Sequence, residues 1–294
     1  MKTQINSNSG GTTVDTLTMA RMVQYIIPLP PLSEQERIVG RINELLSTQQ
    51  HLTQSLEEYS SNVASLKSKV IDAGIQGKLT EQLPEDGNAK DLYQQIQTEK
   101  AKLVQEGKIK KSKPLPPIKP EEIPFEIPKN WKWVRLGDIF EHNTGKALNS
   151  SDKEGSQLTY ITTSNVYWDH FELNNLKSMY FNESEIEKCT IQKGDLLICE
   201  GGDIGRSAIW PYKQEIRIQN HLHRLRPFLP QVVVKYYYYI MWSYKLNGLI
   251  NGRGIGLQGF SSRRVHSLIV PFPPAAEQGR IVDKIGEILN ALEQ

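Results

Sequence analysis

A long heptad repeat of apolar residues follows a proline-rich stretch near the start of the chain. The prolines at 28–31 disfavour a helix before them, and apolar residues then recur at alternating steps of three and four. This pattern predicts a coiled-coil helix over about 34–75. Ser33 is predicted to be its N-cap, with Glu36 completing a capping box. The predicted a and d positions are Ile38, Ile42, Leu45, Gln49, Leu52, Leu56, Tyr59, Val63, Leu66, Val70 and Ala73.

The start of this pattern occurs a second time, 243 residues further along the chain. Of the 21 residues at 26–46, 12 are identical to those at 269–289. A repeat whose period is a whole domain predicts one globular insert between two copies of a helical element. The correspondence extends upstream, so residues 1–27 are expected to be the remnant tail of a first domain. The second copy continues the a and d positions with Ile281, Ile285, Ile288 and Leu292.

The remaining segments are separated by changes in composition. We expect a conserved helical region over 28–106, in which a second, charged helix occupies about 88–106. A linker rich in lysine and proline follows at 107–124 and favours extended geometry. The globular insert is expected over 125–270, and 271–294 begins the second helical copy.

Short β-rich runs alternate with turns in the insert. One helix is predicted from about Gln231 to Leu246. Tyr236–Tyr239 within it could form a base-stacking platform, but consecutive aromatic residues point all around a helix, so a buried core helix is favoured. We expect an α+β fold: one β-rich domain plus long coiled-coil helices. The predicted strands are Trp133–Leu136, Leu158–Ile161, Asp195–Cys199, Arg206–Trp210, Ile216–Ile218 and Leu222–Leu225.

Composition narrows the class of protein. The chain has 294 residues, 38% of them hydrophobic, which is enough for a sizeable core. There is no apolar run of membrane-spanning length, and we expect a soluble, cytoplasmic protein. Cys189 and Cys199, ten residues apart, indicate neither a disulfide framework nor a zinc site.

Charge is distributed unevenly along the insert. Residues 138–200 carry five Lys/Arg against eleven Asp/Glu, a net charge of −6. Residues 201–270 carry ten Lys/Arg against two Asp/Glu, a net charge of +8. The asymmetry favours a basic face that binds a polyanion, although a solvated basic face without a partner stays open. The lysines at 108–113 could likewise contact a DNA backbone or simply be solvated.

Motifs of self-contained catalysis or cofactor binding are weak. The glycines at 254–259 match a dinucleotide fingerprint as a string, but they follow a predicted helix rather than a strand. The run 201–207 is one residue short of a P-loop and has arginine in place of lysine. His221 and His223 would share a strand face without an evident third metal ligand, so DNA-facing or packed histidines are favoured.

Planar polar side chains suited to reading DNA are grouped in three places in the second half of the insert. They are the glycine-rich loop at 200–207, the segment 219–224, and the segment 253–264. Arginine matches guanine edges, and asparagine or glutamine matches adenine edges, through paired hydrogen bonds. Serine and lysine contact phosphates and set the register.

Three longer motifs bear a resemblance to a known family. They are the duplicated Pro-Leu-Pro-Pro-Leu-Ser-Glu-Gln-Glu-Arg-Ile at 28–38, Gly77-Lys-Leu-Thr followed by 106–118, and Ile-Pro-Lys-Asn-Trp-Lys-Trp-Val-Arg-Leu-Gly-Asp at 127–138. Together they resemble the DNA specificity subunit of type I restriction–modification systems. The third is similar to the usual opening of a target recognition domain in that family.

The resemblance implies a non-catalytic subunit that reads double-stranded DNA. Family members carry two target recognition domains, each reading half of an interrupted site, held apart by paired helices. Partner subunits supply methylation, with S-adenosylmethionine, and ATP- and Mg²⁺-dependent restriction, so no cofactor is expected on this chain. Composition, loop position and this resemblance together select the expected DNA-binding residues: Lys146, Thr163, Asn165, Gly201, Gly202, Asp203, Arg206, Gln219, Asn220, His221, Arg224, Arg253, Gln258, Ser261, Arg263 and Arg264.

This chain departs from the family in holding one complete recognition domain. We therefore expect a half-size subunit that pairs with a second copy through its coils and reads an inverted repeat. The expected interface is Ile38, Ile42, Leu45, Leu52, Leu56, Tyr59, Val63, Leu66, Val70, Ile281, Ile285, Ile288 and Leu292. Two alternatives stay open: a truncated, non-functional specificity fragment, and a coiled-coil scaffold whose insert binds protein.

Overall fold

The chain forms two compact units, Met1–Asn62 and Val63–Gln294, which are described separately. Within them, the computed structural model describes residues 18–111, 113–149, 151, 153–250 and 259–293. The expected tail of a first domain therefore lies largely outside the described residues. Its described part contains the short helix α2 (Met19–Met22).

The first unit is dominated by the N-terminal part of α3 (Leu32–Ile75), a single helix of 44 residues, about 66 Å long at 1.5 Å per residue. The helix begins directly after Pro31, whose carbonyl accepts hydrogen bonds from the amides of Glu34 and Gln35. Ser33 therefore lies inside the first turn, and its prediction as the N-cap was wrong. The predicted a and d residues of this unit are exposed: Ile38, Ile42, Leu45, Leu52, Leu56 and Tyr59.

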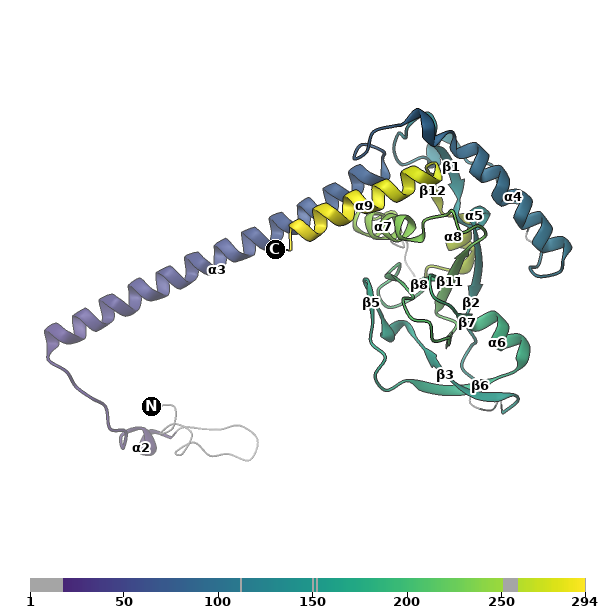
Figure 1. The fold of residues 1–294 in the computed structure, drawn as a ribbon. Helices are drawn as coiled ribbons and strands as arrows, with labels where there is room; N and C mark the ends of the chain where they lie inside the picture. Colours follow the sequence, from purple (N-terminus) through teal and green to yellow (C-terminus); the bar gives the residue numbers. More distant parts are fainter. Residues whose placement is uncertain (1–17, 112, 150, 152, 251–258, 294) are drawn as a thin grey trace. The chain divides into compact units, whose positions relative to one another are not determined.

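In the second unit the end of α3 packs against α9 (Ala275–Ala291). Gly74 lies against Ile281 and Ile285, and the Lys67 ammonium lies 2.8 Å from the Glu293 carboxylate. Residue numbers therefore rise on one helix as they fall on the other, so the pair is antiparallel (Figure 1). Of the remaining predicted interface residues here, Val70 is buried, Val63, Ile288 and Leu292 are half-buried, and Leu66 is exposed.

A second helix, α4 (Ala89–Gln105), follows the 3-10 turn η1 (Pro84–Asp86). The Asn88 side chain caps α4 by accepting from the Lys90 amide. Leu92 and Ile96 of its apolar stripe are buried, and the rest of the helix is largely solvated. The linker that follows includes η2 (Pro120–Glu122) and is anchored by buried Arg135, whose guanidinium donates to the carbonyl of Pro116.

Two four-stranded sheets form the body of the insert. One has the order β2-β11-β8-β9 and is antiparallel; the other has the order β6-β3-β10-β7, in which only the β3–β10 pair is parallel. The strands of the first sheet are β2 (Phe140–Thr144), β8 (Leu196–Cys199), β9 (Ser207–Ile209) and β11 (Leu222–Pro227). Those of the second are β3 (Ser156–Ile161), β6 (Lys177–Phe181), β7 (Thr190–Ile191) and β10 (Ile216–Ile218).

Two smaller strand pairs complete the unit. Strand β1 (Lys132–Arg135) pairs antiparallel with β12 (Ile269–Phe272), and β4 (Val166–Tyr167) forms a hairpin with β5 (His170–Phe171). All six predicted strands are present and the α+β prediction is confirmed. Strands β2, β4, β5, β6, β7 and β12 were missed. The first five are short or carry few β-branched residues, and β12 contains Pro271, which argues against a strand in a sequence pattern. The connecting helices are α5 (Leu136–Ile139), η3 (Thr163–Asn165), α6 (Glu183–Cys189) and α8 (Ser262–Ser267).

The central core helix is α7 (Val234–Leu246), which starts three residues after the predicted Gln231. Tyr236–Tyr239 are all buried, which confirms the core-helix interpretation over a base-stacking platform. The helix packs against α9 and β9, so it joins the coil to the sheet (Figure 1). No described helix is both long and apolar enough to cross a membrane.

Candidate nucleic-acid interface

The backbone of Glu200 holds together the three segments in which planar polar residues are grouped. Its amide donates to the carbonyl of His221 at 2.9 Å, and its carbonyl accepts from the amide of Phe260 at 2.9 Å. Glu200 itself opens the glycine-rich loop between β8 and β9. Sequence segments separated by up to 60 residues therefore meet at one end of the β2-β11-β8-β9 sheet. Arg253 and Gln258 of the third segment lie outside the described residues.

The glycine-rich loop is held in place rather than loosely suspended. Gly202 and Gly205 have φ of 71° and 83°, a region that favours glycine. The Lys245 ammonium lies 2.8 Å from the Asp203 carboxylate and donates to the Ile204 carbonyl, which ties the loop to α7. Asp203 is thus already paired with a cation, while Gly201 and Gly202 have open space around them.

Arg206 projects from the end of this loop into a stack of planar groups. Its guanidinium lies 5.0 Å from the ring centre of Tyr167 and donates at 2.7 Å to the Thr163 carbonyl. The Tyr167 ring stacks in turn on His170, with centres 4.9 Å apart and planes at 12°. The contact with Tyr167 and the hydrogen bond to Thr163 hold the guanidinium in place, and a guanidinium held in place can offer hydrogen bonds to a base edge. Tyr167 and His170 are exposed and were not predicted.

The hairpin that carries this pair had a local signal in the sequence. Tyr167 and His170 are directly opposite one another, joined by the two residues Trp168 and Asp169. Asp169 has a φ of 62°, as tight hairpin turns require and aspartate tolerates. Residues that flank a two-residue turn face each other across the strands, so their rings can stack.

The turn after β10 presents the second group of predicted residues. Gln219 and Asn220 are half-buried. Their backbone amides donate to the backbone carbonyls of Ile161 and Lys146, respectively. His221 is exposed, with Nδ1 3.8 Å from the Glu200 carboxylate. His221 therefore borders the glycine-rich loop, and Gln219 and Asn220 precede it in the same turn.

The third group of predicted residues lies at the start of α8. Ser261 and Arg264 are half-buried, and Arg263 is exposed. The Arg264 guanidinium lies 5.7 Å from the Phe260 ring centre, and its contact with the Ile250 carbonyl is long, at 3.4 Å. Arg263 and Arg264 leave two cations beside the loop, where they can meet phosphates.

Three predicted DNA contacts are corrected by their surroundings. Arg224 is 2% exposed and donates to the Thr190 carbonyl and to the Glu141 carboxylate at 2.8 and 3.0 Å. Lys146 is buried with its ammonium 2.7 Å from the Glu185 carboxylate. Removing either cation would leave its carboxylate partner without this ion pair, so both cations are engaged within the fold rather than presented to DNA.

Asn165 is the third correction. Its side-chain oxygen accepts from the Thr162 amide at 2.9 Å, and its side-chain nitrogen donates to the Glu172 carbonyl at 2.8 Å. Both ends of the amide are thus engaged in shaping the turn at η3. Thr163 is half-buried in the same turn and meets Arg206 through its backbone carbonyl.

The +8 charge of residues 201–270 is partly neutralised by the fold. Among the described residues of this segment, four cations form ion pairs, three of them with acids from 138–200. The pairs are Arg224–Glu141, Arg226–Asp195, Lys235–Asp169 and Lys245–Asp203. The positive charge available to a polyanion is consequently smaller than the sequence indicated, and two of the remaining cations, Arg263 and Arg264, lie in the first turn of α8.

Three histidines lie beneath this interface. His223 Nε2–H donates to the Phe260 carbonyl at 2.7 Å, which leaves its Nδ1 to accept from His142 Nε2 at 3.0 Å; His266 stacks on His142. Burial lowers the pKa of His142 to about 3 and that of His223 to about 4, so both are neutral. His223 is therefore packed, whereas His221 is exposed. No cluster of three or more potential ligands able to hold a metal ion occurs in the described part of the chain.

Neither cysteine has the environment of a reactive thiol. Both are buried, and burial raises the pKa of Cys199 to about 11 and raises that of Cys189. A thiol that stays protonated is a poor nucleophile.

Residues 1–58 and 128–294 match the profile of the type I restriction modification DNA specificity domain. The chain belongs to this family. It is 31% identical over 321 residues to the type I restriction enzyme EcoAI specificity subunit of Escherichia coli, covering 90% of this chain and 53% of the relative. It is 25% identical to the Escherichia coli EcoEI specificity subunit, covering 92% and 54%. The chain thus spans about half the length of these curated relatives.

Solved structures share the fold. The HsdS subunit from Thermoanaerobacter tengcongensis matches with a TM-score of 0.53 at 20% identity, over 99% of this chain and 60% of that one. A structure reported for complex assembly and conformational transition of the type I R-M system matches with a TM-score of 0.59 at 20% identity, over 99% and 61%. The architecture of a helical coil plus a β-rich domain is therefore that of the family.

Proposed function

We propose that this chain reads double-stranded DNA for a type I restriction–modification complex. The observation that carries the proposal is the meeting of the glycine-rich loop, the 219–221 turn and the start of α8 around the Glu200 backbone. Arg206, held by its contact with the Tyr167 ring, supplies a base-reading group at this place. Arg263 and Arg264 supply phosphate contacts that set the register.

In this proposal the chain itself carries out no reaction. A methylation subunit brings S-adenosylmethionine, and a restriction and motor subunit brings ATP and Mg²⁺, all in the cytoplasm. The side chains that could have suggested catalysis support this division. The buried histidines and cysteines are held neutral, and the interface residues are suited to recognition rather than to proton or group transfer.

We further propose that two copies associate through α3 and read an inverted repeat interrupted by a spacer. The motive is the exposed apolar stripe of the first unit, which in water favours burial against another helix. Symmetry in such a dimer would be mirrored in the DNA site. Light scattering at tens of micromolar tests this, because a chain that stays monomeric there contradicts the proposal.

The function is tested by methylome sequencing of cells that co-express this chain with its methylation subunit. We expect adenine methylation at one interrupted, palindromic motif, absent when the chain is omitted. No new methylation, together with no duplex binding by the purified chain, would favour a non-functional fragment.

The scaffold alternative is distinguished by salt. Phosphate contacts release counterions, so duplex affinity should fall steeply between 50 and 200 mM salt. A protein-binding scaffold would show neither saturable duplex binding nor this dependence.

A further inference from the structure

Two separate segments hold Arg206, and both of them contact the same helix. Arg206 itself belongs to the glycine-rich loop, whereas the Tyr167 ring that it contacts belongs to the β4–β5 hairpin. The contact between the two side chains therefore exists only while the hairpin and the loop keep their relative position. Helix α7 forms an ion pair with each of these segments.

The turn of the hairpin lies on the start of α7. The Lys235 ammonium lies 2.5 Å from the Asp169 carboxylate and 4.2 Å from the Tyr238 ring centre. The Trp168 ring packs on the rings of Tyr238 and Trp242, with centres 6.0 and 6.5 Å apart. Trp168 and Asp169 are the two residues of the turn, so α7 contacts the hairpin directly beside its stacked pair of rings.

The glycine-rich loop is attached near the other end of α7. The Lys245 ammonium lies 2.8 Å from the Asp203 carboxylate and donates to the Ile204 carbonyl at 2.8 Å. Lys235 and Lys245 are ten residues apart in the sequence of one helix. They are therefore separated by about 15 Å along its axis. Because the helix is a stiff spacer, its two ion pairs restrain the separation between the hairpin and the loop.

Helix α7 is itself held in the helical core of the second unit. It packs against α9 (Figure 1). The Asp72 carboxylate of α3 accepts from the Ser243 hydroxyl at 2.6 Å and from the Asn247 side-chain amide at 3.1 Å. The two recognition segments are consequently tied to a buried helix, in addition to their contacts with the sheet.

We propose that Lys235 and Lys245 are positioning residues for DNA recognition. Together with their carboxylate partners they keep the hairpin and the loop at the separation at which Arg206 contacts the Tyr167 ring. Both lysines act through Arg206, and the ammonium of each is already paired with a carboxylate. The assignment rests on the proposed function, because it takes Arg206 as the group that reads a base edge.

A measurement on the free, full-length protein tests the structural step by itself. The Arg206 Nε atom is shielded from solvent, so its N–H should exchange slowly with water and give a proton–nitrogen NMR signal that Arg206→Lys removes. Asp169→Asn and Asp203→Asn remove one ion pair each, and asparagine tolerates the φ of 62° at residue 169. We expect this N–H to exchange about tenfold faster in either variant, because the local structure opens more often. Unchanged exchange in either variant overturns the proposal.

The second measurement compares two duplexes. One contains the motif at which the wild-type chain directs methylation, and the other contains the same bases in scrambled order. Asp169→Asn and Asp203→Asn should each lower the ratio of the two affinities about fivefold, at the lower end of what one paired base contact contributes. Affinity for the scrambled duplex should not fall, because each change removes a negative charge. If the released lysines bound phosphates instead, both affinities would rise alike and the ratio would stay constant, which overturns the proposal.

A double-mutant cycle shows whether the ion pairs act through Arg206. In the Arg206→Ala background, the same asparagine changes should alter the affinity ratio by about twofold or less. A reduction as large as in the wild-type background would show that they act independently of Arg206, and would refute their role as positioning residues.

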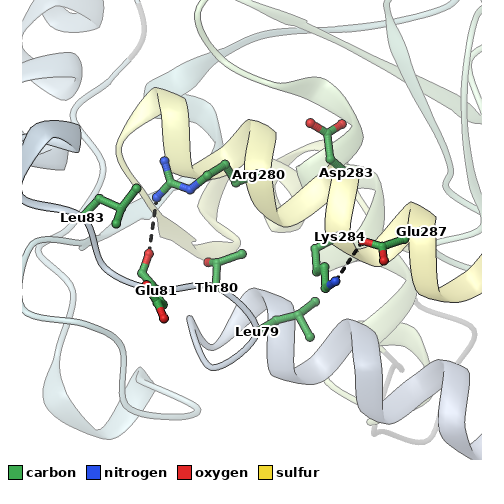
Figure 2. Close-up of a pocket in the computed structure, with 8 residues that line it drawn as sticks. All are labelled: Leu79, Thr80, Glu81, Leu83, Arg280, Asp283, Lys284 and Glu287. Carbon is green, nitrogen blue, oxygen red and sulfur yellow. Dashed lines mark hydrogen bonds and ion pairs between the residues drawn. The ribbon is translucent and has the colours of Figure 1, made fainter.

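An ion pair elsewhere on the second unit provides the matched control. Lys284 pairs with Glu287 at 2.9 Å on α9, beside residues 79–83 rather than the hairpin or the loop (Figure 2). Glu287→Gln removes the same charge and should leave both the exchange rate and the affinity ratio unchanged. Lys235→Met should reproduce the effect of Asp169→Asn, and Lys235→Arg should retain the wild-type ratio. These two variants decide the matter if an asparagine variant is unfolded by circular dichroism.

The outcomes separate this proposal from the proposed function. A wild-type chain that binds both duplexes equally refutes the proposed function. A wild-type preference that survives Asp169→Asn and Asp203→Asn refutes the positioning role alone.

Discussion

Replacing Glu277 by alanine should destabilise the second unit strongly, while the same change at Glu34 should not. The Glu277 carboxylate is fully buried and accepts from the side chains of Trp131 and Gln82. Hydrogen bonds to a charged group contribute about 1.5–3 kcal/mol each, and alanine leaves the indole N–H buried without an acceptor. Relief of the buried charge offsets part of this loss, so we expect a net loss of about 3 kcal/mol.

The assay is thermal unfolding at pH 7, followed by circular dichroism and by tryptophan fluorescence. For a unit of this size, about 3 kcal/mol lowers Tm by about 6–12 °C. Glu34 occupies the same position in the first copy and is exposed, so Glu34→Ala should cost about 0.5 kcal/mol or less. Equal shifts for the two variants, or a shift below about 2 °C for Glu277→Ala, would refute this reasoning.

The pH dependence of this variant pair gives an independent check. Burial raises the pKa of Glu277 above its ordinary value of 4.5. The native state therefore holds this proton more tightly than the unfolded chain does. The contribution of Glu277 to stability falls as pH rises from below 4.5 through the raised pKa. Glu277→Gln, which cannot ionise, should remove that dependence and should cost less than Glu277→Ala at pH 7.

Further predictions concern recognition, acid stability and association. Arg206→Ala should change or abolish the methylated motif. Arg263→Ala should instead weaken duplex binding evenly across sequences and reduce the slope of log affinity against log salt concentration by about one. Equal effects of both variants on all sequences would contradict the base-reading role of Arg206. Unfolding free energy should fall as pH drops from 6.5 toward 4, by up to about 1.4 kcal/mol per pH unit for each buried histidine, because their native pKa values lie near 3 and 4. His142→Gln should reduce this acid sensitivity in melts across pH, and exposed His221→Ala should leave it intact. Leu52→Asp should abolish self-association in light scattering without lowering the Tm of the second unit; a dimer that persists would place the contact elsewhere.

Local rules explain why much of the architecture could be predicted from the sequence. Heptad spacing requires a long helix, and short apolar runs between turn residues require strands, so α3 and the six predicted strands followed from periodicity alone. The repeat located the start of α9 because Pro273 and Pro274 set the same boundary as Pro30 and Pro31. Residue type grouped the candidate interface residues in three segments, and the fold brings these segments together at the Glu200 backbone.

Only the tertiary structure decided which of these residues are exposed enough to contact DNA. Arg224 and Arg206 are both arginines of the same basic segment, yet Arg224 is buried on Glu141 and Arg206 lies on Tyr167. The difference depends on which side chains approach from strands far away in the sequence, which no local pattern encodes. The same reason separates the two copies of the repeat. Glu34 and Glu277 have similar neighbours along the chain, but Glu277 is buried against Trp131 and Gln82, which lie far from it in the sequence, whereas Glu34 is exposed.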